Sequence, residues 1–162
     1  MSLTVGNRLP DASFLMMGPA GPTAVELGPK LKGRKVVIFA VPGAFTGVCT
    51  TAHVPSFIRT RAGFAEKGVD EIICISVNDP FVMKAWAEAT GAEAAGLTLL
   101  ADPEASFTKA IGMNFTAPPA GLIDRSARYA MLVDDGVVTV LHREESPGTC
   151  EASAGEGLLA AI

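Results

Sequence analysis

Short apolar runs alternate along the chain with longer segments in which apolar residues recur every three or four positions. The runs at residues 35–40 (KVVIFA) and 71–77 (EIICISV) are rich in β-branched residues, and they predict adjacent parallel strands buried on both faces. Residues 97–100 predict a third strand. Strands that alternate with helix-length segments favour an α/β fold in layers.

Residues that break regular structure set the bounds of the first helix. Pro42 and Gly43 end the first strand, and Thr46 is suited to be the N-cap, which would make Cys49 the third helical residue. Pro55 lacks a backbone N–H, so we expect a kink there or a second helix beginning at that point.

A further helix is expected after the second strand. Asp79 and Pro80 form an N-cap and first helical position, and Gly91 is a suitable end. The apolar residues between them follow helical spacing and predict one apolar face that packs in the core. Its members are Phe81, Val82, Ala85, Trp86 and Ala89.

The C-terminal part of the chain has a different pattern. Two apolar runs, at residues 129–133 and 137–141, flank Asp134-Asp135-Gly136, which is a strong hairpin signal. Residues 151–162 predict a closing helix. Parallel central strands followed by an antiparallel hairpin suggest a thioredoxin-like fold, with a central mixed sheet flanked by helices. No repeat or linker divides the chain, so we expect one domain over residues 1–162.

Composition narrows the class of protein. Hydrophobic residues make up 49% of the 162 residues and charged residues 19%, which is enough apolar material for a buried core. The net charge of −4 and the absence of a basic block argue against binding to nucleic-acid phosphates, so we expect no nucleic-acid partner. The sequence shows neither a signal-peptide pattern nor an apolar run of membrane-spanning length, so we expect a cytoplasmic protein that does not bind membranes.

The three cysteines, at positions 49, 74 and 150, lie far apart. Their spacing fits neither a secreted disulfide framework nor a zinc site, and no CxxC pair of the thioredoxin type is present. No dinucleotide, phosphate-loop or haem motif accompanies them, so we expect neither a metal nor a cofactor.

Cys49 is the candidate nucleophile. The start of a helix favours an anion, and a thiolate is the nucleophilic form of cysteine. Thr46 offers a hydroxyl on the same helix face, and Pro42 can shield that face from water. The alternative is a buried cysteine that acts as a small apolar residue. His53 lies one turn further on, and a Cys–His hydrolase would use it as a base, but a hydrogen bond within the wall of the site is the preferred role.

Pro42, Thr46 and Cys49 match the Pro-x-x-x-Thr-x-x-Cys motif of the peroxiredoxins. The longer run at residues 42–57 (PGAFTGVCTTAHVPSF) resembles the type II, peroxiredoxin-5-like branch, and the likeness extends over nearly the whole chain. The branch usually has Pro-Thr before the cysteine where this chain has Gly47-Val48. Glycine in a first helical turn costs up to about 1 kcal/mol, so we expect a weaker helix start.

The resemblance implies a cofactor-free thiol peroxidase that reduces hydrogen peroxide and alkyl hydroperoxides through a sulfenic acid on Cys49. It identifies Arg128 as the active-site arginine, with Arg125 as the poorer candidate. It also implies a homodimer with its contact near Phe45 and residues 81–86. The alternative function is a peroxide-responsive redox sensor or binding module that uses the same thiol.

The resemblance also indicates how oxidised Cys49 is restored. Cys74 and Cys150 both resemble resolving positions of the branch. Cys150 ranks higher, because it follows a turn-rich segment (SPGT), whereas Cys74 lies in a central strand. Direct attack by an external thiol, either glutathione with glutaredoxin or thioredoxin, is at least equally favoured.

Overall fold

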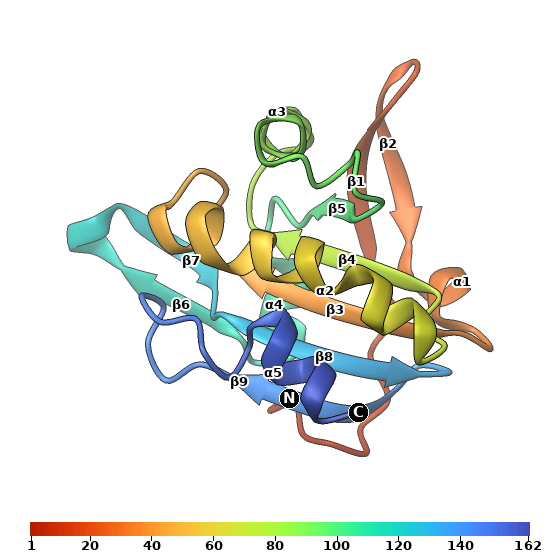
Figure 1. Cartoon of the computed structure of the whole chain (residues 1–162). Helices are drawn as coiled ribbons and strands as arrows, with labels where there is room; N and C mark the ends of the chain where they lie inside the picture. Colours follow the sequence, from red (N-terminus) through yellow and green to blue (C-terminus); the bar gives the residue numbers. More distant parts are fainter.

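The computed structural model describes all residues, 1–162, and shows a seven-stranded mixed sheet in the order β2-β1-β5-β4-β3-β8-β9 (Figure 1). The strands of this sheet are β1 (Ser13–Gly18), β2 (Gly21–Glu26), β3 (Lys35–Val41), β4 (Glu71–Ser76), β5 (Thr98–Ala101), β8 (Tyr129–Asp134) and β9 (Val137–Arg143). A separate two-stranded ribbon consists of β6 (Asn114–Ala117) and β7 (Leu122–Ser126). The helices are α1 (Leu27–Leu31), the π-helical η1 (Cys49–His53), α2 (Val54–Glu66), α3 (Pro80–Thr90), α4 (Ser106–Ala110), the 3-10 turn η2 (Pro118–Ala120) and α5 (Gly155–Ala160).

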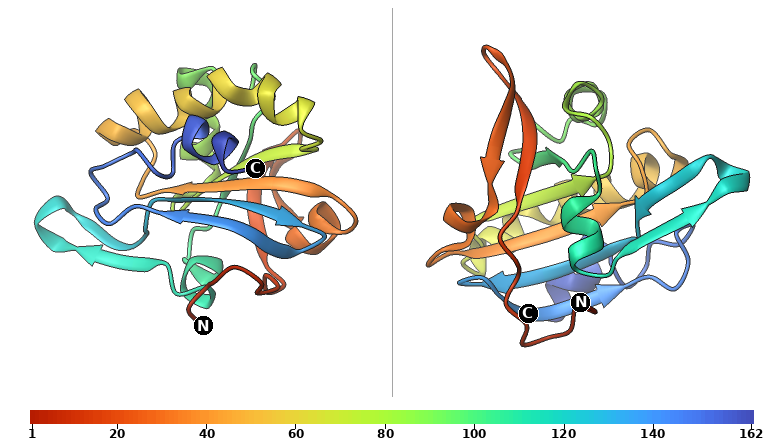
Figure 2. Two further views of the ribbon diagram at one scale, coloured as in Figure 1. Left: turned by 60° about the horizontal axis from the view of Figure 1, so that its bottom comes forward. Right: turned by 180° about the vertical axis from the view of Figure 1, so that it is seen from behind.

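The predicted parallel strands form the centre of the sheet. Strand β4 pairs in parallel with both β3 and β5, while β8 pairs antiparallel with β3. Helices α2, α3 and α5 lie on one face and α4 on the other (Figure 2). Alternate residues of β3 belong to the two cores, Val37 and Phe39 on the first face and Val36 and Ile38 on the second. The predicted α/β architecture is confirmed.

The C-terminal hairpin forms as predicted. Asp135 and Gly136 connect β8 to β9 with φ angles of 48° and 82°, which is the left-handed conformation that a tight hairpin turn requires. The predicted closing helix over residues 151–162 is too long, because α5 covers only Gly155–Ala160. Ser153 is held in the preceding turn, where its backbone N–H and its hydroxyl both bond to Glu144.

Helix α3 has the predicted ends but not the predicted buried face. Asp79 Oδ1 accepts a hydrogen bond from Val82 N at 2.8 Å, and Gly91 ends the helix with φ of 75°. The residues of α3 that are buried are Pro80, Met83, Trp86 and Ala87. Of the predicted face only Trp86 is buried, while Phe81, Ala85 and Ala89 are exposed. Apolar residues occur on both sides of this helix, so spacing alone could not show which side packs against β1 and β5.

Two hairpins were not predicted. Residues 17–22 form the tip of the β1–β2 hairpin, and residues 117–121 form the tip of the β6–β7 ribbon. The exposed strand β2 has no regular alternation of apolar residues, so its sequence carries little strand signal. No helix in the structure has the length and apolar character needed to cross a bilayer.

Candidate active site

Thr46 and Cys49 lie at the start of the helix that follows β3. The helix begins at Gly47, and the carbonyl of Thr46 accepts a hydrogen bond from Thr50 N at 3.1 Å, as expected for an N-cap residue. Its hydroxyl, however, bonds to no backbone N–H. It lies 2.8 Å from Cys49 Sγ and 2.7 Å from the carbonyl oxygen of Gly43. One hydroxyl proton serves only one acceptor at a time, so a thiolate at Cys49 would draw it from the carbonyl to the sulfur.

After Gly47 and Val48 the helix continues as a π-helical segment, Cys49–His53, in which Val54 N donates to the carbonyl of Cys49 five residues earlier. Helix α2 then begins at Val54, with Pro55 in its first turn. The chain stays helical at His53 and Val54, so the predicted second helix at Pro55 is not separate: one continuous helix changes there from π- to α-helical hydrogen bonding. Both Cys49 and His53 are fully buried, and they lie at the two ends of the π-helical segment.

Arg128 is the cation that contacts the sulfur of Cys49. It lies just before β8 with 2% of its surface exposed, and its Nη2 is 3.1 Å from Cys49 Sγ. Its Nη1 lies 3.0 Å from His53 Nδ1, and its Nε and Nη2 donate to the carbonyl of Pro147 at 3.2 and 3.0 Å. A guanidinium stays protonated in proteins, so a fixed positive charge faces the sulfur.

Arg125, the poorer candidate, lies on β7, and its Nη1 donates to the carbonyl of Pro42 at 3.3 Å. It makes no hydrogen bond to Cys49. Pro42 itself is buried at the end of β3, beside the loop that precedes the helix. The structure thus brings Thr46 and Arg128 together at the sulfur of Cys49. Pro42 precedes Gly43, whose carbonyl accepts from the Thr46 hydroxyl, and Arg125 bonds to the carbonyl of Pro42.

His53 is a neutral, doubly hydrogen-bonded ring. Burial and the positive charge of Arg128 lower the pKa of His53 to about 3, so the ring is uncharged at neutral pH. Because arginine can only donate, Nδ1 of His53 is the acceptor, and its Nε2–H donates to the carbonyl of Ser153 at 2.9 Å. No ring nitrogen is left to take the thiol proton, so the arrangement does not support a Cys–His hydrolase.

The other two cysteines differ in their surroundings. All three thiols are free, and Cys74 is fully buried in β4, where burial raises the pKa of its thiol well above the usual range. Cys150 is half-buried in the loop between β9 and α5, and burial raises the pKa of its thiol too, although Arg128 opposes this effect. Neither cysteine is bonded to Cys49.

Several residues around the site make contacts that were not predicted. Asn78 Oδ1 accepts a hydrogen bond from Ala44 N at 3.0 Å and so holds the loop between β3 and the helix. Trp86 Nε1 donates to the hydroxyl of Thr50, next to Cys49, at 3.0 Å. Pro147 and Ser153 contribute only backbone carbonyls to Arg128 and His53. Any residue type offers a carbonyl, so no motif could have shown these contacts.

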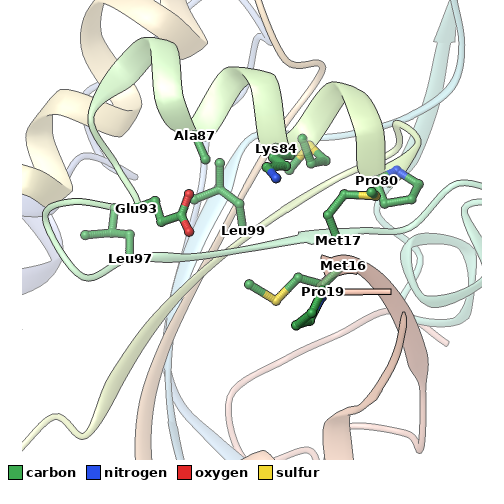
Figure 3. Close-up of a pocket in the computed structure, with 11 residues that line it drawn as sticks. Met16, Met17, Pro19, Pro80, Lys84, Ala87, Glu93, Leu97 and Leu99 are labelled. Carbon is green, nitrogen blue, oxygen red and sulfur yellow. The ribbon is translucent and has the colours of Figure 1, made fainter. Parts of the chain in front are cut away.

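A second concave feature is separate from this site. A cavity of about 260 Å³ lies between the tip of the β1–β2 hairpin and α3, and Met16, Met17 and Met83 are among its lining residues (Figure 3). None of the residues that bond to Cys49 lines it. The structure contains no cluster of three or more side chains that could hold a metal ion.

Comparison with known proteins connects this geometry to a family. The Redoxin family profile matches residues 4–159. Peroxiredoxin-2E-2, chloroplastic, from Oryza sativa subsp. japonica is 45% identical over 165 residues, covering 99% of this chain and 73% of that protein. Peroxiredoxin-2B from Arabidopsis thaliana is 45% identical over 162 residues, covering 99% and 98%. The crystal structure of reduced Prx3 from Vibrio vulnificus in complex with hydrogen peroxide superposes with a TM-score of 0.90 at 45% identity, covering 98% of both chains.

Proposed function

This chain belongs to the peroxiredoxins, thiol-dependent peroxidases with a thioredoxin-like fold, and on that premise we propose that Cys49 is its peroxidatic residue. One observation carries the proposal. The sulfur of Cys49 lies within hydrogen-bonding distance of both the Arg128 guanidinium and the Thr46 hydroxyl, at 3.1 and 2.8 Å. Thr46 is three residues from Cys49 and Arg128 is 79 residues from it, and the two donors meet at one buried sulfur.

The proposed reaction is attack of the Cys49 thiolate on one peroxide oxygen. A sulfur–oxygen bond forms as the oxygen–oxygen bond breaks, and the cysteine becomes a sulfenic acid. The other oxygen leaves with the electron pair of the broken bond and takes up a proton, giving water or an alcohol. Arg128 and Thr46 are positioned to donate hydrogen bonds to the oxygens on which negative charge develops, which is the interaction that lowers such barriers most.

We further propose hydrogen peroxide and alkyl hydroperoxides as substrates, and glutathione with glutaredoxin, or thioredoxin, as the reductant. For an internal resolving thiol, Cys150 is favoured over Cys74. Cys150 lies in an irregular loop and is half-buried, whereas moving Cys74 would require opening the centre of the sheet. Mass spectrometry after one equivalent of peroxide tests this order: a dominant Cys49–Cys74 disulfide would reverse it, and a glutathione adduct on Cys49 would support the external route.

A homodimer in the cytoplasm is the proposed state of the protein. Phe45 and Phe81 are large apolar residues with 55% and 62% of their surface exposed, and Ala85 on α3 is also exposed. Phe45 belongs to the loop that precedes the active-site helix, so a contact there would lie beside the site. Sedimentation showing only monomers at micromolar concentration would exclude the dimer, and a Phe81→Glu variant that stays dimeric would exclude this contact surface.

The test of the function is a peroxide-consumption assay that compares thioredoxin with glutathione plus glutaredoxin. Sustained turnover with either reductant is expected, and the faster of the two identifies the better donor. A protein that is oxidised once and never recycled by either would instead be a redox sensor, so the assay also separates the two functions. Alkyl hydroperoxide in place of hydrogen peroxide extends the same assay to substrate preference.

A further inference from the structure

Glu144 is an ionised side chain outside the group of residues that contact Cys49. It directly follows β9 with 9% of its surface exposed, and one carboxylate oxygen, Oε2, accepts three hydrogen bonds. Ser153 donates its N–H at 2.6 Å and its hydroxyl at 2.5 Å, and Glu151 donates its N–H at 3.1 Å. Burial raises the pKa of Glu144, but these hydrogen bonds outweigh burial and keep the pKa below its usual value, so the carboxylate is charged at neutral pH.

An unbroken series of contacts leads from this carboxylate to the reactive sulfur. The backbone of Ser153, held by Glu144, accepts a hydrogen bond from His53 Nε2 at 2.9 Å. His53 Nδ1 then accepts from Arg128 Nη1 at 3.0 Å, and Arg128 Nη2 reaches Cys49 Sγ at 3.1 Å. Each donor and acceptor role is forced, because a carboxylate only accepts and a guanidinium only donates.

The same loop also holds Arg128 from a second side. Its Nε and Nη2 both donate to the carbonyl of Pro147, which lies between Glu144 and Ser153 in the sequence. The guanidinium plane is therefore fixed by two contacts with one loop, one direct and one through His53. Glu144 is the only carboxylate that bonds to this loop, and its partners are the backbone of Glu151 and the backbone and hydroxyl of Ser153.

We propose that Glu144 is a positioning residue for peroxide reduction, which fixes the Arg128 guanidinium against Cys49 by holding Ser153 and, through it, one tautomer of His53. The proposal rests on the function assigned above, because the rate it affects is the oxidation of Cys49. A merely structural role would make Glu144 an anchor of the loop without an effect on the His53 ring. The state of that ring therefore distinguishes the two roles.

The experiment compares Glu144→Gln with Glu145→Gln. Both changes remove one carboxylate from neighbouring positions, but Glu145 is exposed and its side chain makes no hydrogen bond, so it controls for the loss of charge. The rate of Cys49 sulfenic acid formation is measured by rapid mixing and mass spectrometry. We expect a roughly ten- to hundredfold loss in Glu144→Gln, as for other displacements of a catalytic group, and a wild-type rate in Glu145→Gln.

The second readout is nitrogen NMR of the histidine rings, which is simple because the chain has two histidines. In the wild type and in Glu145→Gln, His53 should show a protonated Nε2 and an unprotonated Nδ1. In Glu144→Gln the two nitrogens should move toward averaged shifts as the tautomer loses its fixed partner. An unchanged ring together with a wild-type oxidation rate would overturn the proposal, as would equal losses in both variants.

If Glu144→Gln fails to fold, Ser153→Ala tests the proposal instead. This variant removes only the hydroxyl bond and retains the backbone carbonyl that His53 uses, so a smaller, several-fold loss of rate is expected. An unchanged rate and an unchanged His53 spectrum in Ser153→Ala would then overturn the proposal. Failure of the proposed function is a separate result, since it would show as a wild-type protein whose Cys49 does not react with peroxide.

Discussion

The active site has two halves of different origin. The local half, residues 42–49, is one continuous loop and helix start, and it contributes Thr46 and Cys49. The distant half consists of Arg128 and the loop at 144–153, and His53 from the active-site helix bonds to both of them. The local half depends on turn and cap chemistry within eight residues. The distant half depends on the sheet, because β3, β8 and β9 must pair in register before Arg128 can face Cys49 and Glu144 can hold Ser153.

The largest effect on activity is expected when the sulfur of Cys49 is replaced, because residues of both halves contact this atom. Cys49→Ser should abolish peroxide turnover while the fold remains, because the oxygen of serine is not oxidised by peroxide and the buried volume changes little. Steady-state peroxide consumption and circular dichroism measure the two properties. Cys74→Ser is the control and should keep most activity, since Cys74 bonds to no site residue. Full activity in Cys49→Ser would reject the mechanism.

Removing one donor from each half tests whether the halves contribute equally. Arg128→Met and Thr46→Val should each slow the oxidation of Cys49 by roughly 100- to 1000-fold, the usual loss when one preorganised donor is removed. Stopped-flow kinetics under single-turnover conditions measures the rates. Arg125→Met is the matched control and should change the rate little, because Arg125 bonds only to the Pro42 carbonyl. Equal losses in Arg125→Met and Arg128→Met would contradict the assignment.

Acid should lower the stability of the folded protein through His53, which bonds to the distant half of the site. The pKa of His53 is about 3 in the folded protein and about 6.5 when the chain is unfolded, so the unfolded state binds a proton that the folded state excludes. Stability is therefore complete above pH 6.5 and is lost as the pH falls toward 3, by about 2 kcal/mol at pH 5. Urea unfolding at pH 7 and pH 5 measures this. The free energy of unfolding should still fall between pH 7 and pH 5 in His142→Gln, but not in His53→Gln. An equal fall in both variants would exclude His53 as the source of the pH dependence.

The smallest effect concerns the helix start in the local half. Gly47 has an ordinary backbone conformation, and a Cβ built there meets no atom within 4 Å. Gly47→Ala should therefore stabilise the protein by about 0.4–1 kcal/mol, chiefly by restricting the unfolded chain. Gly68, with φ of 84°, is the contrasting position, and Gly68→Ala should destabilise. Thermal unfolding compares them, and a lower midpoint for Gly47→Ala would show that the helix start needs glycine.

The two halves also differ in how far the sequence could predict them. The strands β3 and β4, the N-cap Asp79 and the placement of Thr46 beside Cys49 follow from local patterns, and the structure has them as expected. Arg128 was identified from family resemblance, since an arginine before a strand has no local signal of its own.

Predictions that needed tertiary information were less successful. The prediction of which side of α3 is buried was wrong, because the exposed apolar residues of this helix have the same spacing as its buried ones. The closing helix was drawn too long, because the bonds from Ser153 to Glu144 hold residues 151–154 in a turn. The partners Pro147 and Ser153 could not be predicted, since their contribution is a carbonyl. Local chemistry thus specifies where a thiol can react, and long-range pairing supplies the groups that face it.

The bond between Trp86 and Thr50 gives the protein a built-in optical label. Trp86 is the single tryptophan, and its buried indole N–H donates to the hydroxyl of the residue that follows Cys49. Indole fluorescence responds to the polarity and hydrogen bonding around the ring, and no other fluorophore of this kind obscures it. Oxidation and reduction of Cys49 should therefore be visible in real time as changes in emission, without any attached dye, and Thr50→Val would show how much of that signal passes through this one hydrogen bond.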